Sequence, residues 1–306
     1  MFIGSSLKHF IFISLGLAGY LSRRLFPRID TALRKIRLIP HPPDDLRDSN
    51  LDWPKVSVII PTKDKHSFLV EAVNGVRSSC YSNLELIVID NESVEQETAW
   101  YLDALAREGV RVLSFPYRFN YSAMMNMGVQ EASGEFVLAL NNDTSNFSKN
   151  WIQHLVSHVV TDGVGLVGPT LINGDGTIQN HGLILGYLGI AGSLTEKILA
   201  SKSPTALSIL RNCHTADAVS FSCCLIRKSL WELHGGLDER FMVGLNDVDF
   251  GLRFTRSGLT NTICSLASVG HLEYGTRSRM SSLKGSTRAI AEVLTFLDKH
   301  PRFHKP

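Results

Sequence analysis

The chain has 306 residues, of which 44% are hydrophobic and 20% charged, so it can build one large or two ordinary packed domains. Its formal net charge of +2 gives no basis for electrostatic capture, so we expect no nucleic acid partner. The five cysteines are odd in number and lack Cys-x-x-Cys spacing, which argues against a disulfide framework and a zinc site and favours free thiols in a reducing compartment.

The first 39 residues form an apolar and basic segment. Residues 10–21 are nearly all apolar, and a cluster of basic residues follows them up to Arg37. This apolar run is shorter than the roughly 20 residues that span a bilayer, and Ala18-Gly19-Tyr20 is a poor signal-peptide cleavage site. We expect either a membrane-associated segment or a helix that docks on the main domain. A Pro-rich linker at 40–55 follows it.

From residue 56 onward, apolar and β-branched strands alternate with helices. The expected strands lie at 56–60, 84–89, 110–113 and 136–140. The expected helices lie at 67–79, around 100–105 and at 121–132. Near-continuous apolar strands separated by helices are typical of a parallel sheet covered on both faces. The pattern therefore predicts an α/β fold of Rossmann type, with a mostly parallel central sheet.

The second half of the chain is less regular. It contains Gly-rich turns, and its expected elements are strands at 164–167, 217–226 and 260–267, a helix at 247–256, a basic loop after His271 and a C-terminal helix within 281–306. We expect this half to complete the sheet and to build the side of the site that receives an acceptor.

Two short acidic segments carry most of the functional signal. Asn141-Asn142-Asp143 follows the apolar strand at 136–140, and Asn246-Asp247-Val248-Asp249 opens the helix at 247–256. In such sheets, ligands bind beyond the carboxyl ends of the strands. A carboxylate there suits a metal that grips a diphosphate, and a second one suits a base facing the same pocket. Together they indicate metal-assisted transfer of a group from a nucleotide donor to a hydroxyl.

A series of short motifs follows in a fixed order between residues 56 and 280. They are Val58–Thr62, Val88–Ser93, Phe119–Ser122 with Asn126 and Gly128, Gly134–Phe136, Leu140–Thr144, Gly235–Glu239, Asn246–Phe250 with Leu252 and Arg253, and His271 with Glu273, Thr276 and Arg277. In order and spacing these motifs resemble the inverting family 2 glycosyltransferases with a GT-A fold, particularly bacterial members that build surface polysaccharides, among them rhamnosyltransferases. The resemblance implies one GT-A-like catalytic domain at 56–280, with a nucleotide-sugar half at 56–143 and an acceptor half at 144–280.

The resemblance also implies a metal site. Asp143 stands at the last acid of the family's DxD motif, whose first acid is Asn141 in this chain, and His271 resembles an additional metal-contacting histidine. A divalent ion held by one or two protein groups and by phosphate oxygens neutralises the leaving nucleoside diphosphate. Imidazole is an acceptable ligand for Mn²⁺ and an unusual one for Mg²⁺, so either ion can serve. The alternative role for Asp143 is a helix cap or turn residue.

Asp247 is the expected catalytic base. A carboxylate at a rigid helix start can take the proton of an acceptor hydroxyl as it attacks the anomeric carbon. The family has an acidic pair where this chain has Asn246-Asp247. Asp249 is the competitor, because residues two apart on a helix point to different faces and only one of them can face the pocket. The alternative for Asp247 is a helix-capping acid.

The remaining expected contacts with the donor come from strand ends and from two later segments. They are Pro61, Thr62, Asp64, Asp90, Asn91, Ser93, Asn126, Asn141, Asn142 and Arg277. Asp90 is expected to read the base or ribose, although a strand-end turn in which it bonds its own backbone stays an alternative. Asn126 resembles the family's donor-contacting asparagine. Arg277 and Arg279 lie in a segment that is expected either to close over the diphosphate or to form a solvated loop.

These expectations converge on an inverting glycosyltransferase that moves a sugar from a dTDP- or UDP-linked donor to a glycan or lipid-linked glycan. Such an enzyme is expected in the cytoplasm, at the inner face of the membrane. A nucleotidyltransferase is one alternative, but Pro61-Thr62-Lys63-Asp64 lacks the Gly-rich basic signature it needs. A catalytically inactive nucleotide- or glycan-binding relative is another, favoured only by Asn141 and Asn246. A dehydrogenase is excluded because no GxGxxG follows the first strand.

Overall fold

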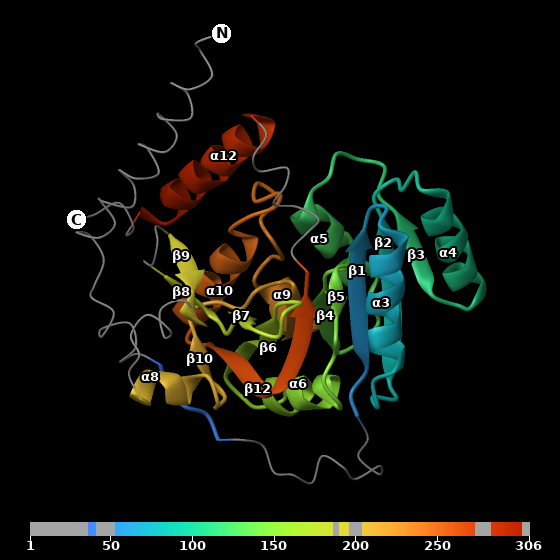
Figure 1. The fold of residues 1–306 in the computed structure, drawn as a ribbon. Coiled ribbons are helices and arrows are strands. Elements are labelled where there is room, and N and C mark those ends of the chain that lie inside the picture. The colour runs from blue at the N-terminus through green and yellow to red at the C-terminus, as the bar shows by residue number, and fades with distance from the viewer. Residues whose placement is uncertain (1–35, 41–52, 186–189, 196–203, 273–282, 302–306) are drawn as a thin grey trace.

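The computed structural model describes residues 36–40, 53–185, 190–195, 204–272 and 283–301. Its centre is a mixed sheet with the strand order β10-β12-β6-β11-β4-β1-β2-β3 (Figure 1). The first four strands along the chain pair in parallel, and they are β1 (Val56–Thr62), β2 (Leu84–Asp90), β3 (Arg111–Ser114) and β4 (Phe136–Leu140). The helices that connect them are α3 (His66–Arg77), α4 (Gln96–Arg107) and α5 (Tyr121–Glu131). The predicted α/β fold with a mostly parallel sheet is confirmed.

The second half adds strands of both directions to this sheet. β6 (Val164–Ile172) and β12 (Thr260–His271) are parallel to each other, whereas β11 (Cys223–Arg227) runs antiparallel between β4 and β6. At the far edge, β10 (His214–Ala216) pairs antiparallel with β12.

The strand predicted at 217–226 is wrong in its first part. Residues 217–222 lie outside the named strands, because the Ser222 backbone N–H donates to the Ser220 hydroxyl in a local turn. This turn faces the pocket described below.

Several elements were not predicted. The largest is α6 (Trp151–Val159), whose apolar residues bury it against β6 and β12. Its helical spacing was present in the sequence at Trp151, Leu155 and Val159. The others are β5 (Thr144–Ser145), β7 (Ile178–Asn180), β8 (Leu183–Leu185), β9 (Ala191–Ser193), α8 (Pro204–Ile209), β10 and α9 (Lys228–Leu233). These elements are too short for periodicity to reveal them, and they depend on tertiary contacts.

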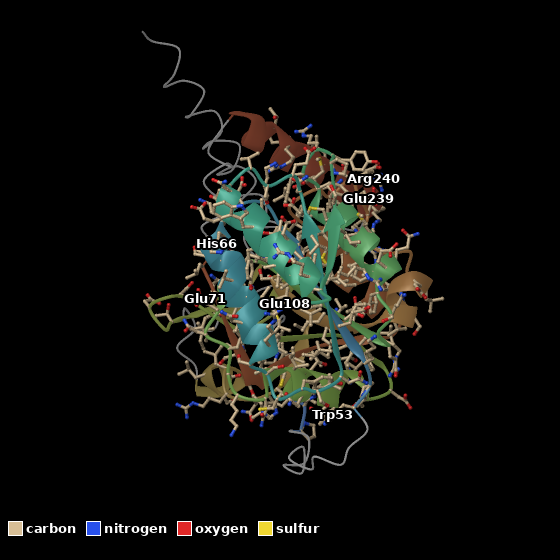
Figure 2. All side chains as sticks on the ribbon, turned by 90° about the vertical axis from the view of Figure 1, so that its right-hand side faces the viewer. Trp53, His66, Glu71, Glu108, Glu239 and Arg240 are labelled. Carbon is tan, nitrogen blue, oxygen red and sulfur yellow. The ribbon has the colours of Figure 1, made fainter. Side chains whose placement is uncertain are left out.

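The core has two layers because β1 alternates its side chains between the two faces of the sheet. Val58 and Ile60 belong to a cluster covered by α3, α4 and α6. Ile59 belongs to a second cluster, covered by α5, α9 and α10 (Asn246–Arg256). Figure 2 shows α3 and α4 side by side, with Trp53, just before β1, at one end and Glu239 and Arg240 at the other.

Both ends of the described chain dock on the second half. Leu38 forms a β-bridge with His214, and the Ile39 N–H donates to the Cys213 carbonyl at 2.8 Å. Residues 36–40 are therefore extended rather than helical. Residues 1–35 lie outside the described residues. α12 (Leu283–Lys299) lies near α10 (Figure 1), and its Phe296 packs with Val248 and Leu252. Among the described residues, no helix has both the length and the apolar character that crossing a membrane requires.

Candidate active site

A pocket of about 300 Å³ opens at the carboxyl ends of β1 and β4. Its wall is made of the end of β1 and the loop after it, the segment after β4, the turn at 220–222, the start of α10 and one residue of α12. The residues that line it are Pro61, Thr62, Lys63, Asp64, Lys65, Phe68, Phe119, Tyr121, Asn141, Asn142, Asp143, Ser220, Phe221, Ser222, Val243, Asn246, Asp247 and Arg288. Both acidic segments of the sequence therefore face one cavity, as expected from strand order.

Asp143, which lines this pocket, faces His271, which is not among the residues that line it. Their side chains are nearly buried, and Asp143 Oδ1 lies 3.2 Å from His271 Nε2. They meet because β5 follows Asp143 directly and pairs with the end of β12, where Thr144 is opposite His271. The amide nitrogen of Asn141 lies 3.3 Å from the same His271 Nε2. Asn141 thus turns its nitrogen, not its oxygen, toward the pair.

A glutamine that the sequence did not reveal fixes how the His271 ring is protonated. Gln179 Nε2 donates to the His271 backbone carbonyl and to Asn173 Oδ1, both at 3.0 Å, which leaves Oε1 facing His271 Nδ1 at 2.8 Å. An amide oxygen only accepts, so Nδ1 carries the hydrogen and the lone pair of neutral His271 is on Nε2. This lone pair faces both Asp143 Oδ1 and the Asn141 amide nitrogen.

The chemistry of this group fits a divalent cation. Asp143 Oδ1 is buried and accepts no hydrogen bond from any described residue. A carboxylate oxygen and an imidazole lone pair this close repel unless a proton or a cation lies between them. A histidine that is held through its other nitrogen by an amide oxygen is the usual arrangement behind a metal-binding imidazole. Asp143 and His271 can therefore hold a metal, with Gln179 behind the histidine.

Asp247 stands in the first turn of α10 and lines the pocket. Its backbone N–H donates to Asn246 Oδ1 at 2.7 Å, and its Oδ1 accepts from the Val248 N–H at 2.8 Å. Burial raises the pKa of Asp247 to about 6, even though these backbone bonds favour the charged form. A carboxylate with such a pKa is well suited to accept a proton near neutral pH.

Asp249 faces away from the pocket. Its side chain is fully buried, and its oxygens lie 2.9 Å from Arg253, Lys299 and His300 nitrogens. Lys299 and His300 tie α10 to the end of α12. Of the two aspartates, only Asp247 is placed to meet a substrate.

The loop after β1 is shaped by hydrogen bonds to the next strand end. Asp64 Oδ1 accepts from the Val94 and Glu95 N–H groups at 2.6 and 2.9 Å, and its own N–H donates to the Ser93 hydroxyl. Asn142 donates to the Thr62 hydroxyl at 3.0 Å. Pro61, Thr62, Asp64 and Asn142 thus line the pocket as a connected group, together with Asn141.

Four other expected donor contacts, Asp90, Asn91, Ser93 and Asn126, do not line the pocket. Asp90 accepts from the Ser93 N–H and hydroxyl, which is the strand-end turn considered as its alternative. Asn91 is buried and donates to the Phe115 and Tyr117 carbonyls at 2.9 and 2.8 Å. Asn126 Nδ2 donates to the Leu237 carbonyl, and Asn126 Oδ1 accepts from the Leu237 N–H, both at 2.9 Å. Arg277 and Arg279 lie outside the described residues.

Sequence reasoning missed the pocket's cations and its aromatic wall. Lys63 and Lys65 follow β1, and Arg288 comes from α12, far away in sequence. Tyr121 donates its hydroxyl to the Phe221 carbonyl at 2.8 Å, and burial raises the pKa of this phenol. Lys63 lies within the Pro61–Asp64 segment and Lys65 directly follows it, so both could have been found from this segment. No local signal marks Arg288 or Gln179.

The fold is that of the GT-A glycosyltransferases. The structure of the mannosyltransferase PcManGT from Pyrobaculum calidifontis in complex with GDP-Man and Mn²⁺ superposes with a TM-score of 0.61 at 16% identity, covering 92% of this chain and 74% of that one. The structure of GalNAc-T7 with UDP, GalNAc and Mn²⁺ gives a TM-score of 0.60 at 17% identity, covering 85% of this chain and 52% of that one.

The chain belongs to glycosyl transferase family 2, whose sequence profile matches residues 57–233. The O-antigen biosynthesis protein RfbC of Myxococcus xanthus is 32% identical over 225 residues, which are 73% of this chain and 18% of that protein. An uncharacterized protein of Sinorhizobium fredii is also 32% identical, over 27% of its length. The chain thus spans about a fifth to a quarter of the length of these relatives.

Proposed function

We propose that the chain is an inverting glycosyltransferase that moves a sugar from a nucleoside diphosphate sugar to a hydroxyl of a growing surface glycan. The observation that carries the proposal is the shared pocket: Asp247, with its raised pKa, faces the same cavity as Asp143, which pairs with His271. A base and a cation-binding pair on one cavity are what single displacement at an anomeric carbon needs.

In this proposal the residues have separate tasks. Asp247 takes the proton of the acceptor hydroxyl as its oxygen attacks the anomeric carbon from the face opposite the leaving group, so the configuration inverts. Asp143 and His271 hold Mn²⁺ or Mg²⁺, which neutralises the nucleoside diphosphate that leaves. Lys63, Lys65 and Arg288 line the pocket and supply further positive charge for the phosphates.

The relatives support the substrates that we propose. Both superposed structures hold a nucleotide or nucleotide sugar with Mn²⁺, and RfbC bears the name of an O-antigen biosynthesis protein. We therefore propose a UDP- or dTDP-linked hexose, including rhamnose, as donor and an envelope polysaccharide intermediate as acceptor. A lipid-linked acceptor places the reaction at the inner membrane face. Within the chain, residues 56–143 bind the donor and residues 144–280 build the acceptor side.

A catalytically inactive binding relative is the competing function. It is favoured by Asn141 and Asn246, which stand where the family has acids. An assay of nucleoside diphosphate release distinguishes an active transferase from an inactive relative. It uses a panel of UDP-, dTDP- and GDP-sugars with acceptor glycans and Mn²⁺. We expect one donor class to turn over with wild type and not with Asp247→Asn. Binding of a donor without turnover of any would establish the inactive relative instead.

The pH dependence of transfer should show the titration of Asp247. Its pKa is raised to about 6, so the carboxylate that accepts the proton is populated above this pH and lost below it. We expect kcat/KM to rise with pH through an acidic limb near 6, and a bound cation to move this limb toward lower pH. Initial rates from about pH 5 to 8, with folding checked by circular dichroism at each pH, test this. A flat profile over this range contradicts the role of Asp247.

Gln179 should tune metal affinity without touching the metal. Removal of the amide oxygen in Gln179→Ala frees the His271 ring to rotate and to change tautomer, and such losses behind a ligand weaken metal binding by about 10- to 100-fold. Gln179→Glu keeps an acceptor for Nδ1 and should recover most of the affinity. Asn173→Ala, which removes contacts to the Gln179 nitrogen and the Thr177 hydroxyl but leaves the Gln179 oxygen facing His271, is the matched control. The measurement is Mn²⁺ binding by electron paramagnetic resonance; equal affinity in wild type and Gln179→Ala contradicts this role.

A further inference from the structure

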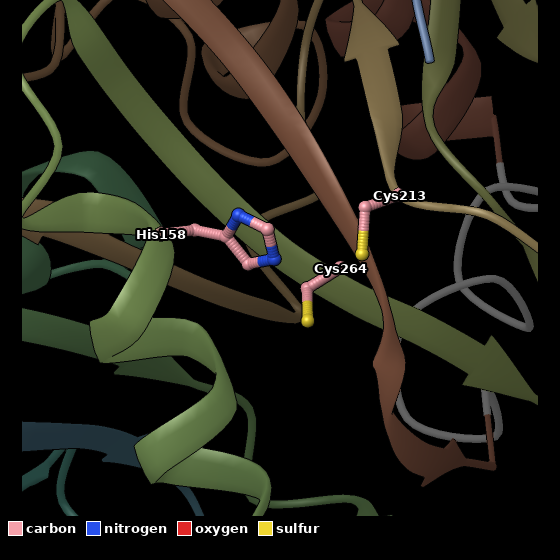
Figure 3. A group of neighbouring side chains, drawn as sticks. All are labelled: His158, Cys213 and Cys264. Carbon is pink, nitrogen blue, oxygen red and sulfur yellow. The ribbon is translucent and has the colours of Figure 1, made fainter. Parts of the chain in front are cut away.

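A second group of metal-ligating side chains lies apart from the pocket. His158 of α6, Cys213 just before β10 and Cys264 of β12 converge in the core, as Figure 3 shows. Their ligand atoms all lie within 4.8 Å of one another, and all three side chains are buried. None of the three lines the active-site pocket.

The two cysteines are opposed by the sheet itself. His214 pairs with Ile263 in the antiparallel ladder of β10 and β12, so the next position along places Cys213 across from Cys264. Cys213 is held from its other side, where its carbonyl accepts from the Ile39 N–H. His158 then reaches the pair from α6, which packs on β12. Three separate elements thus converge on one point.

The histidine of this group is buried beside the two thiols, and its ring interacts with the Cys213 side chain. His158 Nε2 is buried and has no hydrogen-bond partner among the described residues. A buried polar atom left unpaired destabilises a fold. A disulfide between the cysteines would leave this nitrogen unpaired. A cation shared by the three side chains would satisfy it.

The ligand set selects the kind of cation. Two thiolate sulfurs and one imidazole nitrogen favour soft or borderline ions with filled d shells, and disfavour Mg²⁺ and Ca²⁺. Zinc bonds of about 2.3 Å to sulfur and about 2.0 Å to nitrogen place neighbouring ligand atoms just under about 4 Å apart. The three side chains therefore need to close by at most roughly 1.3 Å around one ion.

The place of the group in the fold gives such an ion a structural task. The pairing of β12 with β6 is irregular between Cys264 and Ser268, so the ladder is interrupted directly after the cysteine. The same strand ends at His271 in the active site. An ion bound to Cys264, Cys213 and His158 would fasten β12 to α6 and to the segment before β10 where the ladder is weakest.

We propose that His158, Cys213 and Cys264 form a structural site for one thiophilic d¹⁰ cation, Zn²⁺ or Cu⁺. Binding forms two metal–sulfur bonds and one metal–nitrogen bond, and thiol protons are released to solvent. This site is independent of the transferase activity proposed above. The spacing of 158, 213 and 264 along the chain hides it from motif searches, which is why the cysteines suggested free thiols.

The test is metal analysis of the full chain, purified without oxygen and dialysed against EDTA, which removes a weakly held Mn²⁺ or Mg²⁺. We expect about one equivalent of zinc or copper per chain, and the metal found distinguishes the two ions. Chain stripped under denaturing conditions and refolded with Co²⁺ should show near-ultraviolet sulfur-to-metal charge transfer. Thermal unfolding of the reloaded wild type should shift upward relative to the stripped protein.

Matched variants assign the signal to this group. Cys213→Ser with Cys264→Ser should lose the metal and the charge transfer, whereas Cys223→Ala with Cys224→Ala, a buried pair outside the group, should keep both. His158→Gln should bind more weakly than wild type. The proposal is overturned if folded, reduced wild type takes up neither ion, if the bands survive in the Cys213/Cys264 variant, or if mass analysis finds those two cysteines as a disulfide. None of these readouts depends on sugar transfer.

Discussion

Asp247→Asn is expected to lower kcat for sugar transfer by about 10²- to 10⁴-fold, the usual contribution of a general base. Asparagine has nearly the shape of aspartate, but it cannot take a proton from the acceptor hydroxyl. Because Asp247 is not among the residues proposed to hold metal or phosphate, the affinity for donor and Mn²⁺ should change little. Stopped assays of product formation and separate titrations of the donor measure these two quantities.

The same substitution should stabilise the fold. Burial raises the pKa of Asp247 to about 6, so the charged form that dominates at neutral pH is less favourable in the folded chain than in the unfolded one. An uncharged amide removes this cost, on the order of 3 kcal/mol at neutral pH and less below about pH 6. A higher unfolding midpoint together with lost turnover would distinguish a catalytic role from simple damage.

Asp249→Asn is the matched control two residues away. Asp249 is buried against Arg253 and Lys299, and loss of its charge leaves Arg253 without this carboxylate while Lys299 keeps Asp238. Breaking a buried ion pair in this way destabilises a fold by about 3–5 kcal/mol. The two variants should thus move stability in opposite directions. If Asp249→Asn, while still folded, loses turnover to the same extent and Asp247→Asn does not, the base has been assigned to the wrong residue.

Asp143→Ala is the second large expected effect. Asp143 Oδ1 and His271 Nε2 face each other at 3.2 Å without a donor for the carboxylate, so removal of this oxygen leaves the site with one ligand. We expect Mn²⁺ binding to fall at least about 100-fold and Mn²⁺-dependent turnover to fall with it. Asp175→Ala, which removes an exposed acid from a turn, should change neither. Unchanged Mn²⁺ affinity in Asp143→Ala would show that the metal binds elsewhere.

The Rossmann-type half of the fold was predictable because its strands are continuous apolar runs that end in polar residues. The position of β11 was not, since an apolar run such as Cys223–Ile226 does not encode strand direction. Some residues of the candidate site were likewise predictable from the sequence, and others were not. Asp143 and Asp90 both follow strands, yet only the structure shows that Asp143 faces the pocket while Asp90 closes its own turn. The local sequence does not distinguish an aspartate that faces the pocket from one that bonds within its own turn.

The residues that sequence could not supply come from distant segments. Gln179 reaches His271 from β7, and Arg288 reaches the pocket from α12. The choice between Asp247 and Asp249 depended on where α12 places Lys299 and His300. Such contacts are set by how elements dock, and no spacing within one element records them.

The central claim is that a cation held by Asp143 and His271 couples to binding of a nucleoside diphosphate in the pocket beside Asp247. Calorimetric titration of the full chain with UDP, dTDP and GDP, in Mn²⁺ and in EDTA, for wild type and Asp143→Ala, tests it most directly. We predict tight binding of one nucleotide in Mn²⁺ that collapses in EDTA and in Asp143→Ala. A folded chain that binds no nucleotide, or binds one equally well in EDTA, would contradict it.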